Sequence, residues 1–259
     1  FLWEIKCAIK VEKWITLYNH TVDQWLEVIT FFDAKNSLAN FCFNHPSYVF
    51  PEIVKDSSII NSQKLGHPLL NSKNRIDNDF EINKNSFLIV TGANMAGKST
   101  FLRTISLSIV MANIGLPVCA NSFKYKPVKL ITSMRTSDSL AENESYFYSE
   151  LKRLKLIVDT IKTDDYFIVL DEILKGTNSK DKASGSKKFV EKLVTLNTTG
   201  IIATHDVSLC ELENDFKEIK NFFFDAKISN NELSFDYLFK KGVCENMNAS
   251  FLLKKMKII

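Results

Sequence analysis

Residues 87–100 read Phe-Leu-Ile-Val-Thr-Gly-Ala-Asn-Met-Ala-Gly-Lys-Ser-Thr (FLIVTGANMAGKST), and this segment indicates the fold class. Its apolar start predicts a buried strand over 87–91, and a helix is expected from Lys98 to about residue 114. The residues between them fit G-x-x-x-x-G-K-[ST], in the strand–loop–helix context that the motif requires. The sequence therefore predicts a loop that binds the phosphates of a nucleotide at the N-terminus of a helix.

The chemistry of phosphate binding accounts for the residue types in this loop. Glycines at 92 and 97 let the backbone turn so that consecutive N–H groups point inward and bind an anion. Lys98 supplies a positive charge for the β- and γ-phosphates, and the hydroxyl of Ser99 is a ligand for Mg²⁺. The nucleotide-binding residues expected here are Gly92, Ala93, Asn94, Met95, Ala96, Gly97, Lys98, Ser99 and Thr100.

A second apolar run, 166–170, ends in Asp171 and Glu172. A central strand there would bring both carboxylates to the edge of the sheet where the nucleotide binds. Asp171 is then expected to hold Mg²⁺ through water, and Glu172 to polarise the attacking water. The run 201–203 predicts the next strand, and His205 follows it closely enough to reach the γ-phosphate. Glu172 and His205 are therefore the candidate catalytic residues.

Short apolar runs alternate with amphipathic stretches from about residue 60 onward. Strands are expected at 87–91, 129–134, 166–170 and 201–203, and helices at 98–114, 145–161 and 182–196. This alternation predicts an α/β fold, a P-loop NTPase whose mostly parallel sheet is covered by helices on both faces. The block 222–224 (FFF) is expected to form an edge or hairpin strand, with its turn at 230–231.

The first 50 residues have a different pattern, with apolar residues at helical spacing and charges between them. Trp3, Trp14 and Trp25 all lie in this segment and are expected to be packing residues. X-Pro pairs at 45–46 and 50–51 then predict a boundary. The expected organisation is a helical segment over 1–55, an ATPase domain over 56–240 and a small helical tail over 241–259.

The composition is that of an ordinary globular chain, with 45% hydrophobic and 24% charged residues. A formal net charge of +3 neither indicates nor excludes nucleic-acid binding. Five widely spaced cysteines without a CxxC pair argue against a zinc site or a disulfide framework and favour a reducing, cytoplasmic compartment. No apolar run approaches the ~20 residues that a membrane span needs. Because the first residue is Phe, we expect a fragment of a longer protein.

Three motifs together resemble the ATPase domain of the MutS family of DNA mismatch repair proteins. They are 91–100 (TGANMAGKST), 170–181 (LDEILKGTNSKD) and 203–206 (ATHD). The Asn-Met pair inside the loop is particular to that family among P-loop proteins, and so is a Gly-Thr pair soon after Asp-Glu. Further likenesses are 33–39 to the end of the family's lever helices, 144–151 to its signature stretch, and 241–250 to its C-terminal helical element.

The resemblance implies an ABC-type ATPase that hydrolyses ATP with Mg²⁺ and works as a homodimer with two composite sites. Ser145 of the other subunit would face the γ-phosphate. Thr177 and Asn178 would lie at the subunit interface and pass information between the sites, and the tail 241–259 would support dimerisation. The full-length protein would couple ATP turnover to double-stranded DNA, mismatched or branched, and to repair partner proteins.

The chain departs from the family pattern in ways that indicate a divergent branch. Ala93 replaces the usual Pro, Ala96 the usual Gly, Tyr146 the usual Thr, and 173–175 (ILK) the common Ile-Gly-Arg. In the family an aromatic ring stacks on the base near residues 75–78, and neither Arg75 nor Ile76 is aromatic.

Other classes of ATPase fit the sequence less well. A MutS-derived switch that acts on a non-DNA partner is the main alternative. A transporter-type ABC ATPase would carry a Leu-Ser-Gly-Gly-Gln-type signature, and nothing similar occurs between Met134 and Asp171. A small-molecule kinase would have a lid rich in arginine, whereas residues 132–150 contain only Arg135.

Overall fold

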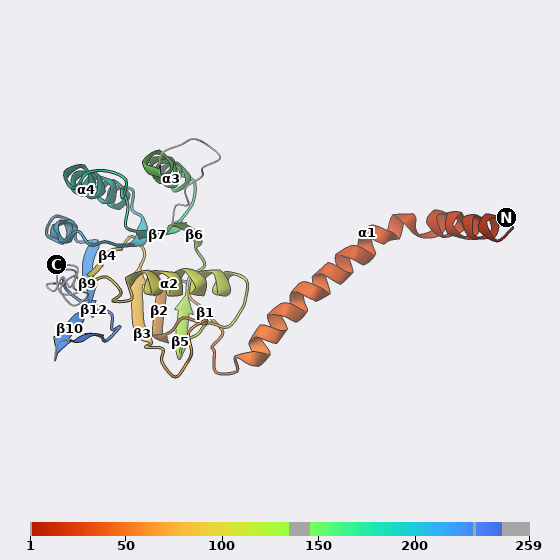
Figure 1. The fold of residues 1–259 in the computed structure, drawn as a ribbon, viewed down its shortest axis with the longest axis horizontal. Helices are drawn as coiled ribbons and strands as arrows, with labels where there is room; N and C mark the ends of the chain where they lie inside the picture. Colours follow the sequence, from red (N-terminus) through yellow and green to blue (C-terminus); the bar gives the residue numbers. More distant parts are fainter. Residues whose placement is uncertain (1, 135–145, 230–231, 245–259) are drawn as a thin grey trace. The chain divides into compact units, whose positions relative to one another are not determined.

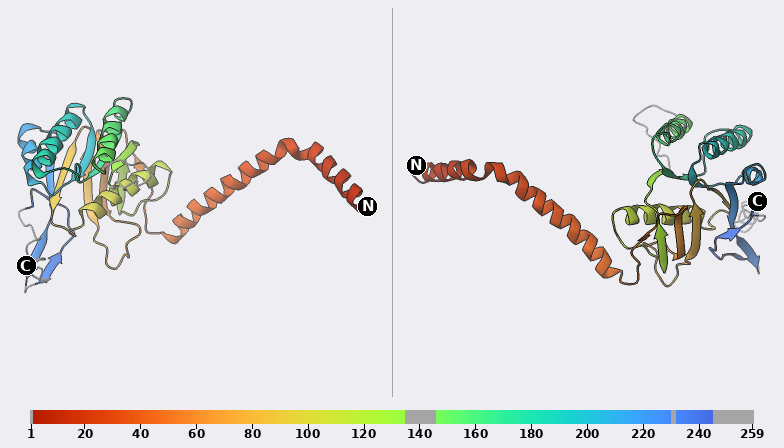
Figure 2. Two further views of the ribbon diagram at one scale, coloured as in Figure 1. Left: turned by 45° about the horizontal axis from the view of Figure 1, so that its top comes forward. Right: turned by 180° about the vertical axis from the view of Figure 1, so that it is seen from behind.

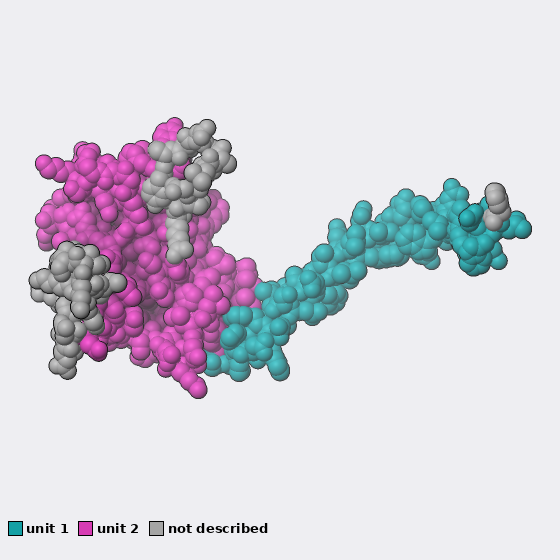
Figure 3. Space-filling model, viewed as in Figure 1, with its two compact units in different colours: residues 1–47 teal, residues 48–259 magenta. Residues whose placement is uncertain are grey.

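The structure is a computed structural model that describes residues 2–134, 146–229 and 232–244. The chain divides into two compact units, residues 1–47 and 48–259, which have separate colours in Figure 3. The units divide directly behind the N-terminal helix, whereas the sequence analysis places the boundary at 55. The helix ends at Asn44 because residue 45 precedes Pro46, and a residue before proline disfavours the helical conformation.

The first unit consists of the long helix α1 (Leu2–Asn44), drawn in red and orange in Figure 1. None of its described residues is buried. Trp14 and Trp25 are 46% and 45% exposed, and both pack against Tyr18 with ring centroids 5.9 and 5.8 Å apart. Trp14 and Trp25 also contact each other, whereas Trp3 is 73% exposed, so the expectation that all three tryptophans are packing residues is not met within the described residues.

The second unit is built around a six-stranded sheet with the order β12-β9-β4-β8-β7-β6. The strands are β4 (Phe87–Gly92), β6 (Lys129–Ser133), β7 (Tyr166–Asp171), β8 (Thr199–Ala203), β9 (Ile219–Phe224) and β12 (Lys240–Lys241). The strands from β9 to β6 are parallel, and β12 pairs antiparallel with β9. β4 and β8 are buried along their whole length, as expected for strands at the centre of a sheet covered on both faces.

Helices cover one face of this sheet and form the main core with it. They are α3 (Tyr146–Thr160), α4 (Ser179–Thr195), the short 3₁₀ helix η1 (Val207–Glu211) and α5 (Leu212–Asp215). Ile157 of α3 and Leu193 of α4 are fully buried against sheet residues such as Ile168. Figure 1 shows α3 and α4 on the side of the sheet away from α2 (Lys98–Asn113).

The main sheet has α2 on one face and α3 and α4 on the other, in agreement with the predicted arrangement. A second sheet that was not predicted covers the outer side of α2. Its order is β1-β5-β2-β3, with β1 (Glu52–Ile53), β2 (Ser58–Leu65), β3 (Asn78–Asn83) and β5 (Ser122–Tyr125). The ring of Phe80 in β3 packs edge-on against Phe101 of α2 at 5.6 Å, and the Tyr125 hydroxyl donates to Asn113 at 2.8 Å. Helix α2 therefore lies between two sheets.

The second unit begins with a segment that an isolated β-bridge attaches to the rest. Val49 pairs antiparallel with Val118, and the two residues exchange N–H···O bonds of 3.0 and 2.7 Å. Tyr48 beside it is hydrogen-bonded to the thiol of Cys119 and to Arg75. Burial raises the pKa of Tyr48 to about 12, and the bond to Cys119 acts in the same direction.

The strand predicted at 222–224 is present, but it is not an edge or hairpin strand. These residues belong to β9, which lies beside β4 inside the six-stranded sheet. The ring of Phe222 stacks on Phe239, and the ring of Phe224 packs against Phe101. The hairpin is formed by the next two strands, β10 (Ala226–Ser229) and β11 (Glu232–Phe235), drawn in blue in Figure 2. Residues 230–231, the expected turn, lie outside the described residues.

Most of the expected C-terminal helical element, residues 245–259, also lies outside the described residues. Of the part that is described, residues 240–241 form the edge strand β12, and the backbone N–H of Cys244 donates to the Thr91 hydroxyl at 3.1 Å. Within the described ranges, no helix combines the length and the apolar character that a bilayer span requires.

Candidate functional site

The sequence-predicted residues meet in a cavity of about 570 Å³ at the carboxyl ends of β4, β7 and β8. Parallel strands end at the same sheet edge, so the residues that follow them converge there. The predicted residues that line the cavity are Ala93, Asn94, Met95, Ala96, Gly97, Lys98, Ser99, Thr100, Asp171, Glu172 and His205. The structure thus brings both halves of the predicted site together.

The loop between β4 and α2 has the backbone conformation that its glycines predict. Gly92 has φ +150° and Gly97 φ +103°, and Met95 between them also has a positive φ of 66°. A β-carbon at Gly92 would lie 2.6 Å from the carbonyl oxygen of Phe224 in β9. Glycine is therefore required at 92 both by backbone conformation and by the close approach of the neighbouring strand.

Lys98, the first residue of α2, is a buried cation with 7% exposure. Its ammonium group donates to the carbonyl oxygens of Gly92 at 2.7 Å and Ala93 at 2.9 Å, so the side chain folds back over its own loop. Burial lowers the pKa of Lys98 to about 8, and the nearby carboxylates of Glu172 and Asp171 oppose this change. Such a cation gains from a bound anion, because the anion compensates for lost hydration.

Glu172 and His205 form a hydrogen-bonded pair in which His205 Nε2 lies 2.7 Å from Glu172 Oε1. This bond, with help from the charges of His205 and Lys175, lowers the pKa of Glu172 to about 2 against the effect of burial. A carboxylate only accepts hydrogen bonds, so Nε2 carries the hydrogen. The ammonium of Lys98, 3.4 Å from the same nitrogen, therefore cannot donate to it.

The two predicted magnesium ligands, Ser99 and Asp171, come from different elements and line the same cavity. Ser99 lies in the first turn of α2, and Asp171 is the last residue of β7. The described residues contain no group of three or more His, Cys, Asp or Glu side chains placed to hold a metal. This fits Mg²⁺, which usually takes one or two protein ligands and completes its shell with water and substrate phosphates.

Of the predicted residues that the structure describes, Gly92, Thr177 and Asn178 do not line this cavity. Ser145 lies outside the described residues. Asn178 caps α4, since its side chain accepts from the backbone N–H of Asp181 at 2.9 Å, and Thr177 precedes it. The cap explains why α4 begins at Ser179 rather than at 182 as expected. The subunit-interface role of Thr177 and Asn178 stays a prediction.

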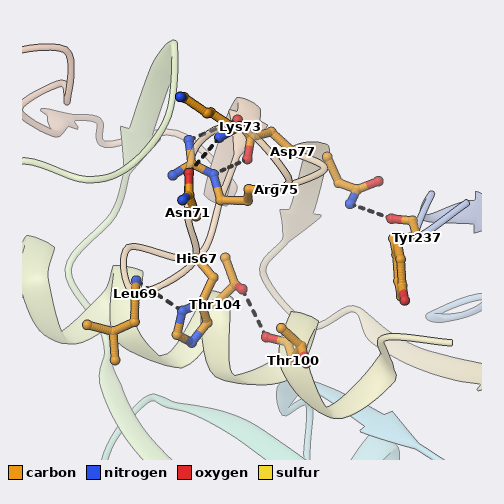
Figure 4. A network of polar contacts seen from close by, with 10 residues as sticks. His67, Leu69, Asn71, Lys73, Arg75, Asp77, Thr100, Thr104 and Tyr237 are labelled. Carbon is orange, nitrogen blue, oxygen red and sulfur yellow. Dashed lines mark hydrogen bonds and ion pairs between the residues drawn. The ribbon is translucent and has the colours of Figure 1, made fainter. Parts of the chain in front are cut away.

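The other end of the cavity includes the region 75–78, near which the resemblance places the base, together with residues that the sequence did not indicate. It is lined by residues of β2, β3 and the loop between them, of β9, and of the segment after β11: Leu65, His67, Leu70, Asn74, Arg75, Ile76, Asn78, Phe224 and Tyr237. Arg75 is held by Asp77 through Nε–Oδ1 and Nη2–Oδ2 contacts of 2.5 and 3.1 Å. Figure 4 shows Arg75 and Tyr237 on different sides of the space above Thr100. No local spacing links residues so far apart in sequence, so no motif could have paired them.

Two contacts fix this end of the cavity. The side chain of Asn78 donates to the Tyr237 carbonyl at 3.0 Å and accepts from the Phe239 N–H at 2.8 Å, which joins the two segments. His67 Nδ1 accepts from the backbone N–H of Leu69 at 3.3 Å. Burial, together with the charges of Arg103 and Arg75, lowers the pKa of His67.

The sequence profile of MutS domain V matches residues 88–256, which include the loop, Asp171, Glu172 and His205. This chain belongs to the MutS family. MutS protein homolog 4 from Homo sapiens is 30% identical over 241 residues, which cover 88% of this chain and 25% of that protein. DNA mismatch repair protein MutS from Fusobacterium nucleatum is 36% identical over 188 residues, 70% of this chain and 21% of that protein.

A third relative, DNA mismatch repair protein MSH4 from Arabidopsis thaliana, is 31% identical over 230 residues, 85% of this chain and 28% of that protein. This MutS-family chain therefore spans about a quarter of the length of the relatives it matches. The family match covers most of the second unit.

Proposed function

We propose that this MutS-family chain is the ABC-type ATPase domain of a DNA mismatch repair or recombination protein, and that it binds and hydrolyses ATP with Mg²⁺. The observation that carries the proposal is the convergence of a buried lysine, two carboxylates and a histidine on one cavity, beside a loop in which Gly92, Met95 and Gly97 have positive φ. These groups are the parts that nucleotide hydrolysis requires.

In this proposal the loop 92–100 binds the phosphates through its backbone N–H groups at the start of α2. Lys98 exchanges its bonds to the Gly92 and Ala93 carbonyls for the β- and γ-phosphates. Ser99 and Asp171 hold Mg²⁺, which supplies positive charge that neutralises the developing phosphate charge. The base lies at the other end of the cavity, bounded by Arg75 and Tyr237.

Glu172 orients the attacking water in the proposed reaction, and its environment defines how. Since its pKa is about 2, Glu172 is ionised at neutral pH and is a weak base. It therefore accepts a hydrogen bond from water and aligns it, rather than taking the proton completely. His205 donates to the other side of this carboxylate and fixes its orientation, with its ring directed toward the cavity.

The intact protein is proposed to act as a homodimer. Ser145, Thr177, Asn178 and the tail 241–259 would belong to the dimer interface, so that ATP binding closes two composite sites. ATP turnover would then control binding to mismatched or branched double-stranded DNA and to repair partner proteins. A MutS-derived switch with a non-DNA partner is the alternative outcome of the test.

The test uses the intact protein and measures ATP binding and phosphate release with homoduplex, mismatched and branched DNA. We expect Glu172→Gln to bind ATP but to lose hydrolysis. Asp206→Asn is the matched control, because Asp206 lies next to His205 yet caps η1 and does not line the cavity. Undiminished turnover in Glu172→Gln would refute the catalytic assignment, and turnover indifferent to every DNA would favour the non-DNA partner.

A further inference from the structure

The turn that carries Glu172 is strained. Glu172 has φ 51° and Leu174 φ 58°, although neither residue is glycine. A left-handed conformation costs a residue with a β-carbon about 1–2 kcal/mol. Such strain persists at functional sites only where surrounding contacts hold the backbone in place. The position of the Glu172 carboxylate therefore depends on what holds residues 172–175.

One such contact is the side chain of Leu174, which is buried in the main core. It lies so close to α4 that a β-carbon at Gly185 would be 2.7 Å from Leu174 Cδ1. The buried side chain explains why leucine is tolerated in a left-handed conformation. This packing anchors the Leu174 side chain. It does not bond the backbone N–H groups of the turn, which need hydrogen-bond partners of their own.

Those partners come from Glu150 in α3. Its Oε1 accepts the N–H of Leu174 at 2.6 Å and its Oε2 accepts the N–H of Lys175 at 3.0 Å, and the residue is 3% exposed. Both oxygens accept, as in an ionised carboxylate, and charge-assisted bonds of this kind are among the strongest in proteins. Glu150 does not line the cavity and touches neither Glu172 nor His205 through any bond described for the site.

A second contact joins the same two segments. The turn continues into Gly176, where a β-carbon would lie 2.8 Å from the β-carbon of Phe147. Phe147 stands in the first turn of α3, one helical turn before Glu150. Helix α3 therefore holds the turn at three consecutive residues, two through the Glu150 carboxylate and one through the packing of Phe147.

We propose that Glu150 is a positioning residue for hydrolysis: it holds the strained turn 172–175 in the conformation that directs the Glu172 carboxylate at the attacking water. This inference rests on the proposed ATPase function and deepens it. Loss of these bonds leaves the loop 92–100 and Lys98 unchanged, so nucleotide binding is retained. What changes is the alignment of Glu172, and misplacement by about 1 Å costs about 100-fold in rate.

The experiment compares Glu150→Gln with the wild-type intact protein. Glutamine has the same shape, but its NH₂ group faces a backbone N–H, so one bond is lost and two donors oppose each other. We expect kcat for ATP hydrolysis to fall about 10- to 100-fold, with ATP affinity changed less than about threefold. Glu213→Gln, which alters another hydrogen-bonded carboxylate on the same side of the sheet, is the control and keeps wild-type kcat.

A second variant separates positioning from general stability. Leu174→Gly removes the buried side chain that anchors the turn and frees the backbone at 174, so the turn depends more on the bonds to Glu150. In the Leu174→Gly background, Glu150→Gln should therefore reduce kcat by a larger factor than in the wild-type background. If Glu150→Gln does not fold, Glu150→Asp, which keeps a carboxylate on a side chain one methylene shorter, is compared with wild type by the same assay.

The outcomes divide clearly between the two proposals. Wild-type protein without ATP hydrolysis would refute the proposed function itself. Active wild-type protein with an unchanged kcat in folded Glu150→Gln would overturn the positioning role and leave the function intact. The positioning role would also be overturned if Glu150→Gln reduced kcat by the same factor in the wild-type background and in the Leu174→Gly background. A loss of ATP affinity as large as the loss of kcat would show a structural role only.

Discussion

Replacement of Lys98 by methionine tests the electrostatic reading of the phosphate loop, because stability and binding should change in opposite directions. Methionine matches the lysine stem in length but carries no charge. Without nucleotide, the variant should be more stable than wild type at neutral pH. With nucleotide, it should show no measurable affinity for ATP, because the charge that meets the β- and γ-phosphates is absent.

The size of the effect follows from the surroundings of Lys98. Burial lowers its pKa from 10.5 to about 8, which corresponds to an unfavourable free energy of about 3 kcal/mol for the charged form. Methionine removes this cost. It also removes the hydrogen bonds to the carbonyl oxygens of Gly92 and Ala93, each worth about 1 kcal/mol. The net gain at pH 7 is therefore about 1 kcal/mol.

The sign of this difference depends on pH. Since the folded-state pKa of Lys98 is lower than its unfolded-state pKa, the unfolded wild type binds more protons between about pH 8 and 10.5. Wild-type stability therefore rises across that window through this group, and the variant has no such rise. Near pH 10.5 the variant should be the less stable protein, by about 2 kcal/mol, because only its lost hydrogen bonds still count.

Urea unfolding followed by circular dichroism at pH 7 and pH 10 measures the difference, and calorimetry measures ATP binding. Lys188→Met is the control, since that lysine of α4 is exposed, does not line the cavity, and its removal relieves no burial cost. A Lys98→Met protein less stable than wild type by the same amount at both pH values would refute the reasoning, and so would retained micromolar affinity for ATP.

Three further changes test separate parts of the site. Gly92→Ala should lower the free energy of unfolding by about 2–4 kcal/mol, because the new β-carbon would meet the Phe224 carbonyl. Gly115 also has a positive φ but has open space around it, so Gly115→Ala should lower the free energy of unfolding by only about 1 kcal/mol. Urea unfolding measures both values. Glu172, whose pKa falls from 4.5 to about 2, contributes at most about 3 kcal/mol above pH 4.5, and this is lost as pH falls toward 2. Acid titrations should show a flatter curve for Glu172→Gln, and an unchanged curve would contradict the pairing with His205. Asn178→Ala should lower the free energy of unfolding by about 1 kcal/mol, because α4 loses its cap. If Asn178 lies at the interface, the free energy of ATP-dependent dimerisation, measured by light scattering, should fall by more than this amount.

The core of the site was predictable because its signals are local. The apolar run before Gly92 predicts β4, the motif predicts the loop, and the helix begins at Lys98 as expected. Asp171, Glu172 and His205 each follow an apolar run that forms a parallel strand, so their convergence follows from sheet topology. The pairing of Glu172 with His205 needed the structure, because side-chain directions do not follow from spacing.

The second sheet was not predicted, although part of its signal is in the sequence. β3 alternates buried and exposed residues, with Asn78, Phe80 and Ile82 inward, which is a regular strand pattern over a short length. β2 pairs with irregular register near both ends and is rich in Asn, Ser, Gln and Lys, so its periodicity is weak. Its pairing with β5 spans some 60 residues of sequence, including the phosphate loop.

Contacts between distant segments could not be inferred from one sequence. Arg75 and Tyr237 line the same cavity, and Glu150 accepts a hydrogen bond from the backbone of Leu174, yet neither pair belongs to a motif. Phe222 illustrates the opposite difficulty. The block 222–224 predicts an edge or hairpin strand, and the ring of Phe239, which stacks on Phe222 from a later segment, could not be inferred from the sequence.

The bridge between Val49 and Val118 has a mechanical consequence. It is the first pairing that the chain makes after the end of α1, and Val118 follows the end of α2 by five residues. A force along the chain from α1 is therefore taken up first by two hydrogen bonds beside the C-terminal end of α2. The other end of that helix, about 24 Å away, is the phosphate loop. The Val49–Val118 bridge and the phosphate loop therefore lie at opposite ends of helix α2. Tension on the chain acts on one end of this rigid helix, and occupancy of the loop acts on the other.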